Sequence, residues 1–101
     1  MAGDPNAFQA LADPTRRAIL KLLSKGSLTA GEIAAHFPLA KPTLSHHFKV
    51  LEGAGLVRFE RRGTSIVYTL QSNVLEDLAA ALLELTSSLG TARKRAVRNS
   101  S

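Results

Sequence analysis

The sequence lacks several features that would direct its interpretation elsewhere. It has no cysteine, which excludes disulfide bonds, thiolate metal sites and cysteine nucleophiles and fits a reducing compartment such as the cytoplasm. Its purely apolar runs span only a few residues, whereas a membrane-spanning helix needs about 20, so we expect no membrane insertion. The first residues show no basic stretch followed by an apolar core, so we expect no secretory signal. A chain of 101 residues has room for one domain.

Charge is unevenly distributed along this chain. Its formal net charge is +5, yet residues 1–90 hold nine Lys or Arg against eight Asp or Glu. The remaining four basic residues lie in 91–101, which have no acidic residue. Residues 41–62 carry five basic and two acidic side chains, whereas residues 72–90 carry three acidic and no basic ones. This distribution predicts one surface that faces a polyanion and another that avoids it.

Two aspartate-proline pairs predict the first two helices. In Asp4-Pro5 and in Asp13-Pro14, an N-cap acid precedes a proline that suits the first helical position. The second helix is expected to run to about residue 24, before the stop signal of a glycine. The first is short, and the residues expected on its apolar face are Phe8, Leu11 and Ala12.

A capping box and a proline predict two further helices joined by a short turn. The box spans Thr29 to Glu32, so a third helix is expected over about 30–37. Pro42 fits the first turn of a fourth helix, expected over about 41–54. Its buried stripe holds Leu44, Phe48 and Leu51. Two helices of this kind, the second with a polar outward face, are typical of a helix-turn-helix.

A predicted β-hairpin, called the wing below, follows the fourth helix directly. Residues 56–61 alternate between apolar and charged, as a half-buried strand does, and residues 66–70 are β-branched and aromatic. A long last helix is then expected from Ser72 or Asn73 to about Leu89, where Gly90 ends it. The predicted fold is mainly α with a small β-hairpin, a winged helix-turn-helix in the order α-α-α-α-β-β-α.

Leucines form a continuous seam on the last helix. Their spacing of 3-4-3-4 is an a/d pattern over two heptads. A core as small as this one cannot cover so long an apolar stripe, so the seam predicts a homodimer. The alternative is that the helix packs only on its own domain. The seam residues are Leu75, Leu78, Leu82, Leu85 and Leu89.

Several linked motifs resemble the ArsR-type (ArsR/SmtB) winged-helix repressors of bacteria, over roughly residues 7–89. They are, in chain order, Leu11-Ala12-Asp13-Pro14-Thr15-Arg16-Arg17 before Ile19-Leu20, then Glu32-Ile33-Ala34, the stretch from Lys41 to Leu51, Ala54-Gly55-Leu56-Val57, Gly63, and Tyr68-Thr69-Leu70. The greatest similarity is to the metal-site-free autorepressor type. The resemblance implies a repressor that binds an inverted repeat in double-stranded DNA as a homodimer, with the fourth helix in the major groove. It also implies a dimer interface built from the first and last helices, namely Phe8, Leu11 and the seam leucines.

Candidate DNA contacts follow from the geometry of the fourth helix and the wing. At about 100° per residue, residues 42, 45, 46 and 49 point away from the buried stripe, and Lys41 and Thr43 lie in the N-terminal part of the helix. Hydroxyls and imidazoles suit base edges and lysines suit phosphates. His47 lies nearer the core edge, so packing and DNA contact are both open. The alternative for the whole set is an ordinary solvated surface. The candidates are Lys41, Thr43, Ser45, His46, His47 and Lys49 on the helix and Arg61, Arg62 and Thr64 on the wing.

Three residues depart from this set. Family members commonly have Ser or Thr at the cap of the fourth helix, where this chain has Ala40, so no contact is carried over to that position. Arg16 and Arg17 start the second helix, an unfavourable end for cations. We expect one of them to make a structural ion pair rather than a specific DNA contact.

A metal cofactor is not expected. The last helix offers Glu76, Asp77 and Glu84 but no histidine, and three oxygen ligands alone suit zinc or nickel poorly. His46 and His47 are adjacent and diverge by about 100°, which leaves His36 as the only third partner. A cysteine-free metal-responsive repressor therefore remains the weaker alternative.

No catalytic residues are assigned, because no phosphate loop, nucleophile elbow or carboxylate pair is present, and we expect no enzyme. The other alternative to a DNA-binding repressor is a winged-helix module that binds a protein through the same surface. Residues 1–90 are expected to form the DNA-binding and dimerisation domain, and residues 91–101 a basic, mobile tail. An additional effector or protein partner is left open.

Overall fold

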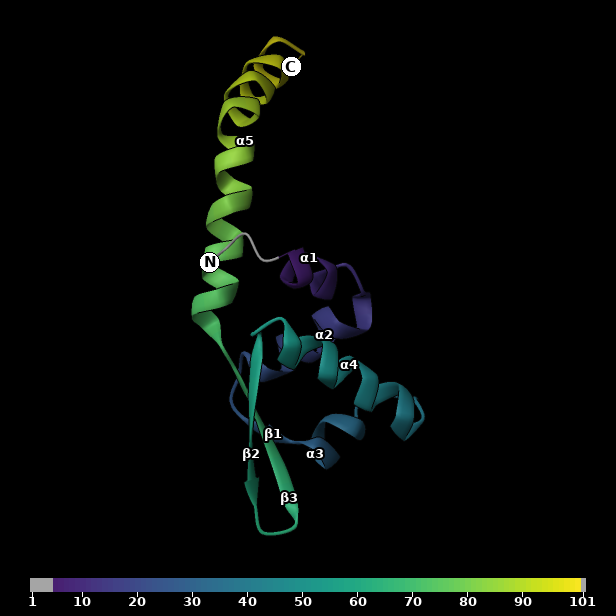
Figure 1. The fold of residues 1–101 in the computed structure, drawn as a ribbon. Coiled ribbons are helices and arrows are strands. Elements are labelled where there is room, and N and C mark those ends of the chain that lie inside the picture. The colour runs from purple at the N-terminus through teal and green to yellow at the C-terminus, as the bar shows by residue number, and fades with distance from the viewer. Residues whose placement is uncertain (1–4, 101) are drawn as a thin grey trace.

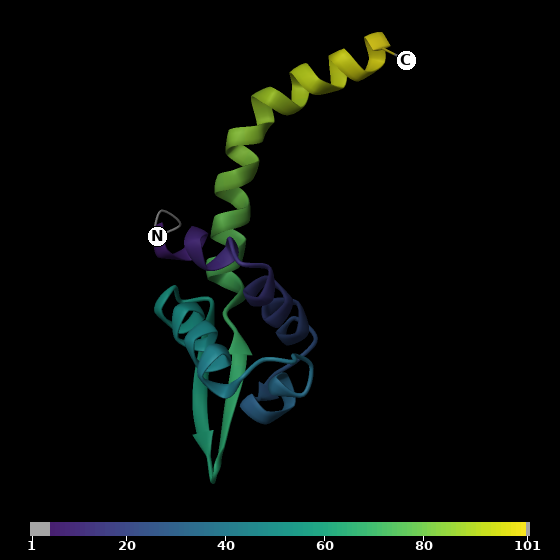
Figure 2. The ribbon, with the colours of Figure 1, turned by 90° about the vertical axis from the view of Figure 1, so that its right-hand side faces the viewer.

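The computed structural model describes residues 5–100, leaving aside the side chains of residues 5, 6, 88 and 90–100. Four helices gather into one body, the hairpin extends from one end of it, and the last helix rises away from the opposite end (Figures 1 and 2). The elements are α1 (Pro5–Leu11), α2 (Pro14–Leu23), β1 (Leu28–Thr29), α3 (Ala30–Ala34), α4 (Lys41–Gly53), β2 (Val57–Arg62), β3 (Ser65–Leu70) and α5 (Ser72–Ser100). This is the predicted winged helix-turn-helix, with one strand more than expected.

Capping chemistry sets the starts of α2 and α3 as predicted. The Asp13 carboxylate accepts a hydrogen bond from the Arg16 backbone N–H at 3.0 Å, which lowers the pKa of this carboxyl from its ordinary value. Thr29 and Glu32 form both bonds of the capping box, at 2.8 and 3.1 Å, and the bond from the Thr29 N–H likewise lowers the pKa of Glu32. At α4 the Ala40 cap makes no side-chain hydrogen bond. The other predicted cap, Asp4, lies outside the described residues.

Helix α3 is shorter than predicted. It ends at Ala34, not near residue 37, because the amides of His36 and Phe37 bond three residues back, to Ile33 and Ala34. Such bonds tighten the last turn of a helix, and Pro38, which has no N–H, follows.

The sheet has three antiparallel strands in the order β1-β3-β2. The hairpin was predicted, and Gly63 takes a positive φ of 60° in its turn, as glycine does readily. Strand β1 was not predicted. It pairs Leu28 with Tyr68 and Thr29 with Val67. A two-residue strand has no alternating pattern, and Thr29 also reads as a helix cap, so no sequence signal marks it.

The hydrophobic core lies among α2, α3, α4, the sheet and the first turns of α5. Helix α1 packs on this core through Ala7 and Ala10, whereas of the predicted apolar face Leu11 is half-buried, Phe8 is 37% exposed and Ala12 is exposed. The short side chains let α1 approach α2 and α4 closely, which turns Phe8 outward. The largest fully buried side chains are Ile19, Ile33, Leu51, Leu56 and Leu78.

Helix α5 does not end near Leu89 but continues to Ser100. Glycine in a helix interior costs only about 1 kcal/mol relative to alanine, and the residues after Gly90 include the helix formers Ala92, Arg93, Lys94, Arg95 and Ala96. A single Gly90 therefore does not stop the helix. Among the described residues, no helix is long and apolar enough to cross a membrane.

Candidate nucleic-acid interface

Helix α4 separates a buried stripe from an exposed polar face, as predicted. Leu44, Phe48 and Leu51 expose 3%, 7% and 0% of their surface and fix the helix on the core. The residues predicted to contact DNA from this helix are exposed, with the exception of His47; they are Lys41, Thr43, Ser45, His46 and Lys49.

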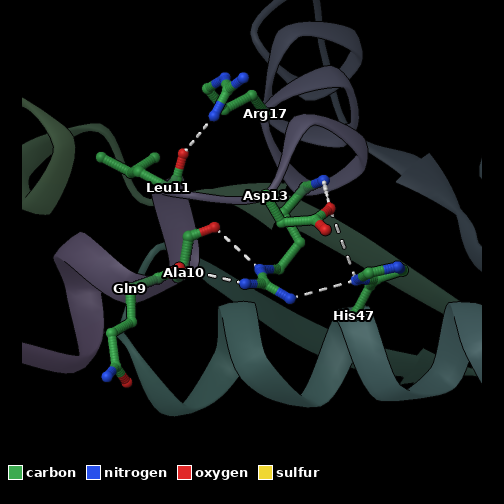
Figure 3. Close-up of polar contacts among 7 residues, drawn as sticks. Gln9, Ala10, Leu11, Asp13, Arg17 and His47 are labelled. Carbon is green, nitrogen blue, oxygen red and sulfur yellow. Dashed lines mark hydrogen bonds and ion pairs between the residues drawn. The ribbon is translucent and has the colours of Figure 1, made fainter.

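His47 belongs to the protein interior, as the packing alternative predicted, and not to the exposed face that holds the other candidates of α4. It is 9% exposed, and its Nδ1 lies 3.3 Å from Arg16 Nη1 and 3.9 Å from Asp13 Oδ2 (Figure 3). The ring thus points toward the corner between α1 and α2. One residue is a rotation of about 100°, which separates the inward ring of His47 from the outward ring of His46.

The two arginines at the start of α2 have structural roles, and most of their side-chain hydrogen bonds go to backbone carbonyls rather than to acidic side chains. Arg16 donates to the carbonyl oxygens of Ala10 through Nε at 2.8 Å and of Gln9 through Nη2 at 3.0 Å. Arg17 donates from Nη1 to the carbonyl oxygen of Leu11 at 2.7 Å (Figure 3). The last carbonyls of a helix have no partner within it, so these guanidinium groups complete the end of α1.

The wing presents its arginines on two different faces. Residues 57, 59 and 61 of β2 lie on the face toward α4, since alternate strand residues share a face. Arg61 accordingly borders a hollow of about 220 Å³ together with Ser45, Lys49 and other residues of α4 and the sheet. Arg62 borders a different hollow on the opposite face and pairs with Glu60, Nη2 to Oε2, at 3.4 Å. Thr64 is exposed in the wing turn.

Contacts between aromatic rings, which were not predicted from the sequence, join the wing to α4. Phe48 and Tyr68 stack with ring centroids 4.5 Å apart, and Phe59 lies 6.3 Å from Tyr68. The Tyr68 hydroxyl donates to Glu52 Oε2 at 3.4 Å. Burial, with the Glu52 carboxylate beside it, raises the pKa of Tyr68 to about 12, so the hydroxyl stays protonated. The available sequence signal was the alternation of residues 57, 59 and 61, which places Phe59 on the face of β2 toward α4.

The leucine seam divides into a buried and an exposed part. Leu78 is 1% exposed and Leu75 packs against the same core, so assigning Leu78 to a dimer interface was wrong. Farther along α5, the helix leaves the body of the domain and its leucines become exposed. The exposed fractions are 47% for Leu82, 71% for Leu85 and 61% for Leu89, and Leu83, which lies off the seam, is 68% exposed.

Helix α1 also exposes apolar side chains. Phe8 is 37% exposed and Leu11 is half-buried.

Among the described residues, no group of three or more His, Asp or Glu side chains is placed to hold a metal ion.

Residues 13–58 match the family of bacterial regulatory proteins called arsR. The chain is 49% identical over 72 residues to the transcriptional repressor SdpR of Bacillus subtilis, covering 71% of this chain and 80% of that protein. It is similar in structure to an ArsR family transcriptional regulator solved by crystallography, with a TM-score of 0.78, 35% identity, and coverage of 89% of this chain and 97% of the other. A homodimeric winged helix-turn-helix DNA-binding domain from Mycobacterium bovis, a possible ArsR-family regulator, aligns with a TM-score of 0.66 and 28% identity over 83% of this chain and 79% of that domain.

Proposed function

Because the chain belongs to the ArsR family of bacterial regulatory proteins, we propose that it is a transcriptional repressor that binds double-stranded DNA as a homodimer. The observation that carries this proposal is the shared surface of α4 and the wing, where Ser45, Lys49 and Arg61 border one hollow. Its relatives are transcriptional regulators and not enzymes. Such a repressor acts where the chromosome is, so we infer a cytoplasmic location.

The side chains of this surface divide by chemistry. Ser45 and His46 carry short, adaptable donors and acceptors and are the proposed readers of base edges in the major groove. Lys41, Lys49 and Arg61 carry full charges on long chains and suit phosphates. Thr43, Thr64 and Arg62 complete the contact set at its margins.

The proposed dimer uses the apolar surface that the single chain leaves open. Leu82, Leu85 and Leu89 continue the line of the buried Leu78 beyond the body of the domain, and Phe8 and Leu11 of α1 add to it. A two-fold dimer presents its two α4 helices to successive turns of the major groove, so the operator is an inverted repeat with half-sites about 10 base pairs apart. Residues 1–90 hold both surfaces.

The test is a comparison of specific and non-specific affinity. A duplex selected by the protein from a random pool serves as the specific probe, and the same duplex with scrambled half-sites as the other. Ser45→Ala and His46→Ala are expected to weaken specific binding by about 1–3 kcal/mol each and to relax discrimination at particular base pairs. His36→Ala is the matched control, because His36 is also exposed but lies after α3, away from this surface.

The same measurement separates the protein-binding alternative. A repressor with several phosphate contacts shows a steep fall of log affinity with log salt concentration. Failure to select any duplex, together with a flat salt dependence, would refute DNA binding. Equal specificity ratios for Ser45→Ala, His46→Ala and the control would show that α4 does not read bases.

A further inference from the structure

The Arg16 side chain lies at the junction of three helices. From the first turn of α2 it reaches the end of α1 through the carbonyls of Ala10 and Gln9, and it reaches the middle of α4 through His47. Figure 3 shows the His47 ring directed at this junction, with Asp13 beside it. Nε and Nη2 of Arg16 contact α1, and Nη1 contacts α4. A single rigid guanidinium therefore spans the two helices.

We infer that Arg16 and His47 are positioning residues that set the rotation of α4 about its axis, and through it the base discrimination of the DNA-binding surface. This inference rests on the proposed function. Neither residue needs to touch DNA: the Arg16 donors are directed to protein acceptors, and His47 is 9% exposed.

The directional contact supplies what the apolar stripe cannot. Leu44, Phe48 and Leu51 hold α4 on the core by hydrophobic burial, which is non-directional. A hydrogen bond prefers an angle above about 150° at its hydrogen and weakens steeply below about 120°. The contact at 3.3 Å between Arg16 Nη1 and His47 Nδ1 therefore adds a directional restraint on the rotation of α4 to the burial of the apolar stripe.

The chemistry of the pair also fixes its orientation. Arginine has donors only and stays charged, so a hydrogen bond between the two side chains requires His47 Nδ1 to accept and the ring proton to lie on Nε2. The planar fork of Arg16 is itself held by two α1 carbonyls. Rotation of α4 about its axis would carry the His47 ring away from Arg16 Nη1, and His46, the residue before it on the same helix, would turn with it.

The junction also connects the two functional surfaces of the proposed repressor. Helix α1 carries Phe8 and Leu11 of the open apolar surface, and α4 carries Ser45 and His46. Because one guanidinium joins these helices, the arrangement of the two protomers and the orientation of the reading face depend on the same contact.

Three variants test the inference. His47→Asn keeps an acceptor, since its Oδ1 lies as many bonds from the backbone as Nδ1 does. His47→Leu keeps a side chain of similar bulk without an acceptor. Arg16→Lys keeps the charge but loses the fork that serves several acceptors at once. The readout is the ratio of affinities for the selected duplex and its scrambled form, with thermal stability, dimer mass and salt slope measured alongside.

His47→Leu and Arg16→Lys are expected to lower the specificity ratio about tenfold, the scale of one hydrogen bond to a charged group, while the salt slope is unchanged. His47→Asn is expected to restore the ratio. The double variant Arg16→Lys/His47→Leu is expected to have a specificity ratio no lower than that of the more affected single variant, because both substitutions remove the same contact between Arg16 and His47. A merely structural role would lower stability and the active fraction, which reduces both affinities equally and leaves their ratio intact.

An unchanged ratio in His47→Leu would overturn the inference, as would an equal loss in His47→Asn and His47→Leu. Both results would leave the proposed function standing, because the wild-type protein would still discriminate between the two duplexes. Wild-type protein that fails to discriminate would refute the proposed function and this inference with it.

Discussion

The division of the leucine seam predicts that two neighbouring stretches of α5 respond differently to substitution. A fully buried leucine side chain contributes about 1.5–3 kcal/mol. Leu82 and Leu85 leave 47% and 71% of their surface for a partner, which corresponds to about 2–3.5 kcal/mol per protomer and about 4–7 kcal/mol per symmetric dimer. Replacing both with glutamate removes this term and adds the cost of burying charge. The dimer dissociation constant is therefore expected to rise at least about a thousandfold.

Two other leucines of the same helix are the controls. Leu83→Glu introduces the same charge at a position that is exposed but about 130° from the middle of the exposed seam, so the dimer is expected to persist. Leu78→Ala is expected to lower the free energy of unfolding by about 2–5 kcal/mol through a core cavity, and to leave dimerisation of the folded protein unchanged.

Sedimentation over a concentration series measures the dimer, and thermal unfolding measures stability. The reasoning is refuted if Leu82→Glu/Leu85→Glu remains a tight dimer, or if Leu83→Glu dissociates the protein as readily as the double variant does. Either result would place the interface on another face.

Three further outcomes follow from contacts on the surface and at the caps. Arg61→Ala is expected to weaken binding to all duplexes alike and to lower the salt slope by about one unit. Arg62→Ala is expected to change the slope less, because Arg62 is paired with Glu60; equal slopes of the two variants in titrations at several salt concentrations would contradict this. Micromolar zinc or nickel is expected to change the affinity for the selected duplex less than about threefold, and a tenfold change, about 1.4 kcal/mol of coupling, would indicate a metal-responsive repressor. The lowered pKa values of Asp13 and Glu32 mean that their ionised forms stabilise the fold above the ordinary values of 3.8 and 4.5 and that this stability is lost as pH falls through and below them. Asp13→Asn/Glu32→Gln is therefore expected to show a smaller loss of melting temperature on acidification than the wild type, and an identical loss would contradict the assignment.

Elements whose signals are local could be predicted from the sequence. The starts of α2 and α3 depend on a cap and the residues three positions later, and Asp13 and Thr29 make those bonds. The wing turn depends on one glycine, Gly63, with a positive φ. The exposed face of α4 follows from helical periodicity once Leu44, Phe48 and Leu51 are assigned to the core.

Features that depend on distant partners could not be predicted in this way. Strand β1 exists only because Leu28 meets Tyr68 of the wing. The partner of His47 lies 31 residues away in sequence, and periodicity alone placed this residue at an ambiguous edge. The burial of Leu78 depends on where α5 leaves the domain body, which a uniform leucine spacing does not encode.

Strand β1 has a consequence for how sequences of this design diverge. Its pairing with β3 consists of backbone hydrogen bonds, which persist whatever side chains occupy the two positions, provided that neither is proline. Most substitutions in β1 therefore leave this pairing possible, although replacement of Thr29 also removes a capping bond of α3. The exposed residues of α4, such as Ser45 and His46, contribute nothing to the core. A lineage can therefore exchange these residues, and with them the base sequence that the proposed repressor would recognise, while inheriting the scaffold unchanged.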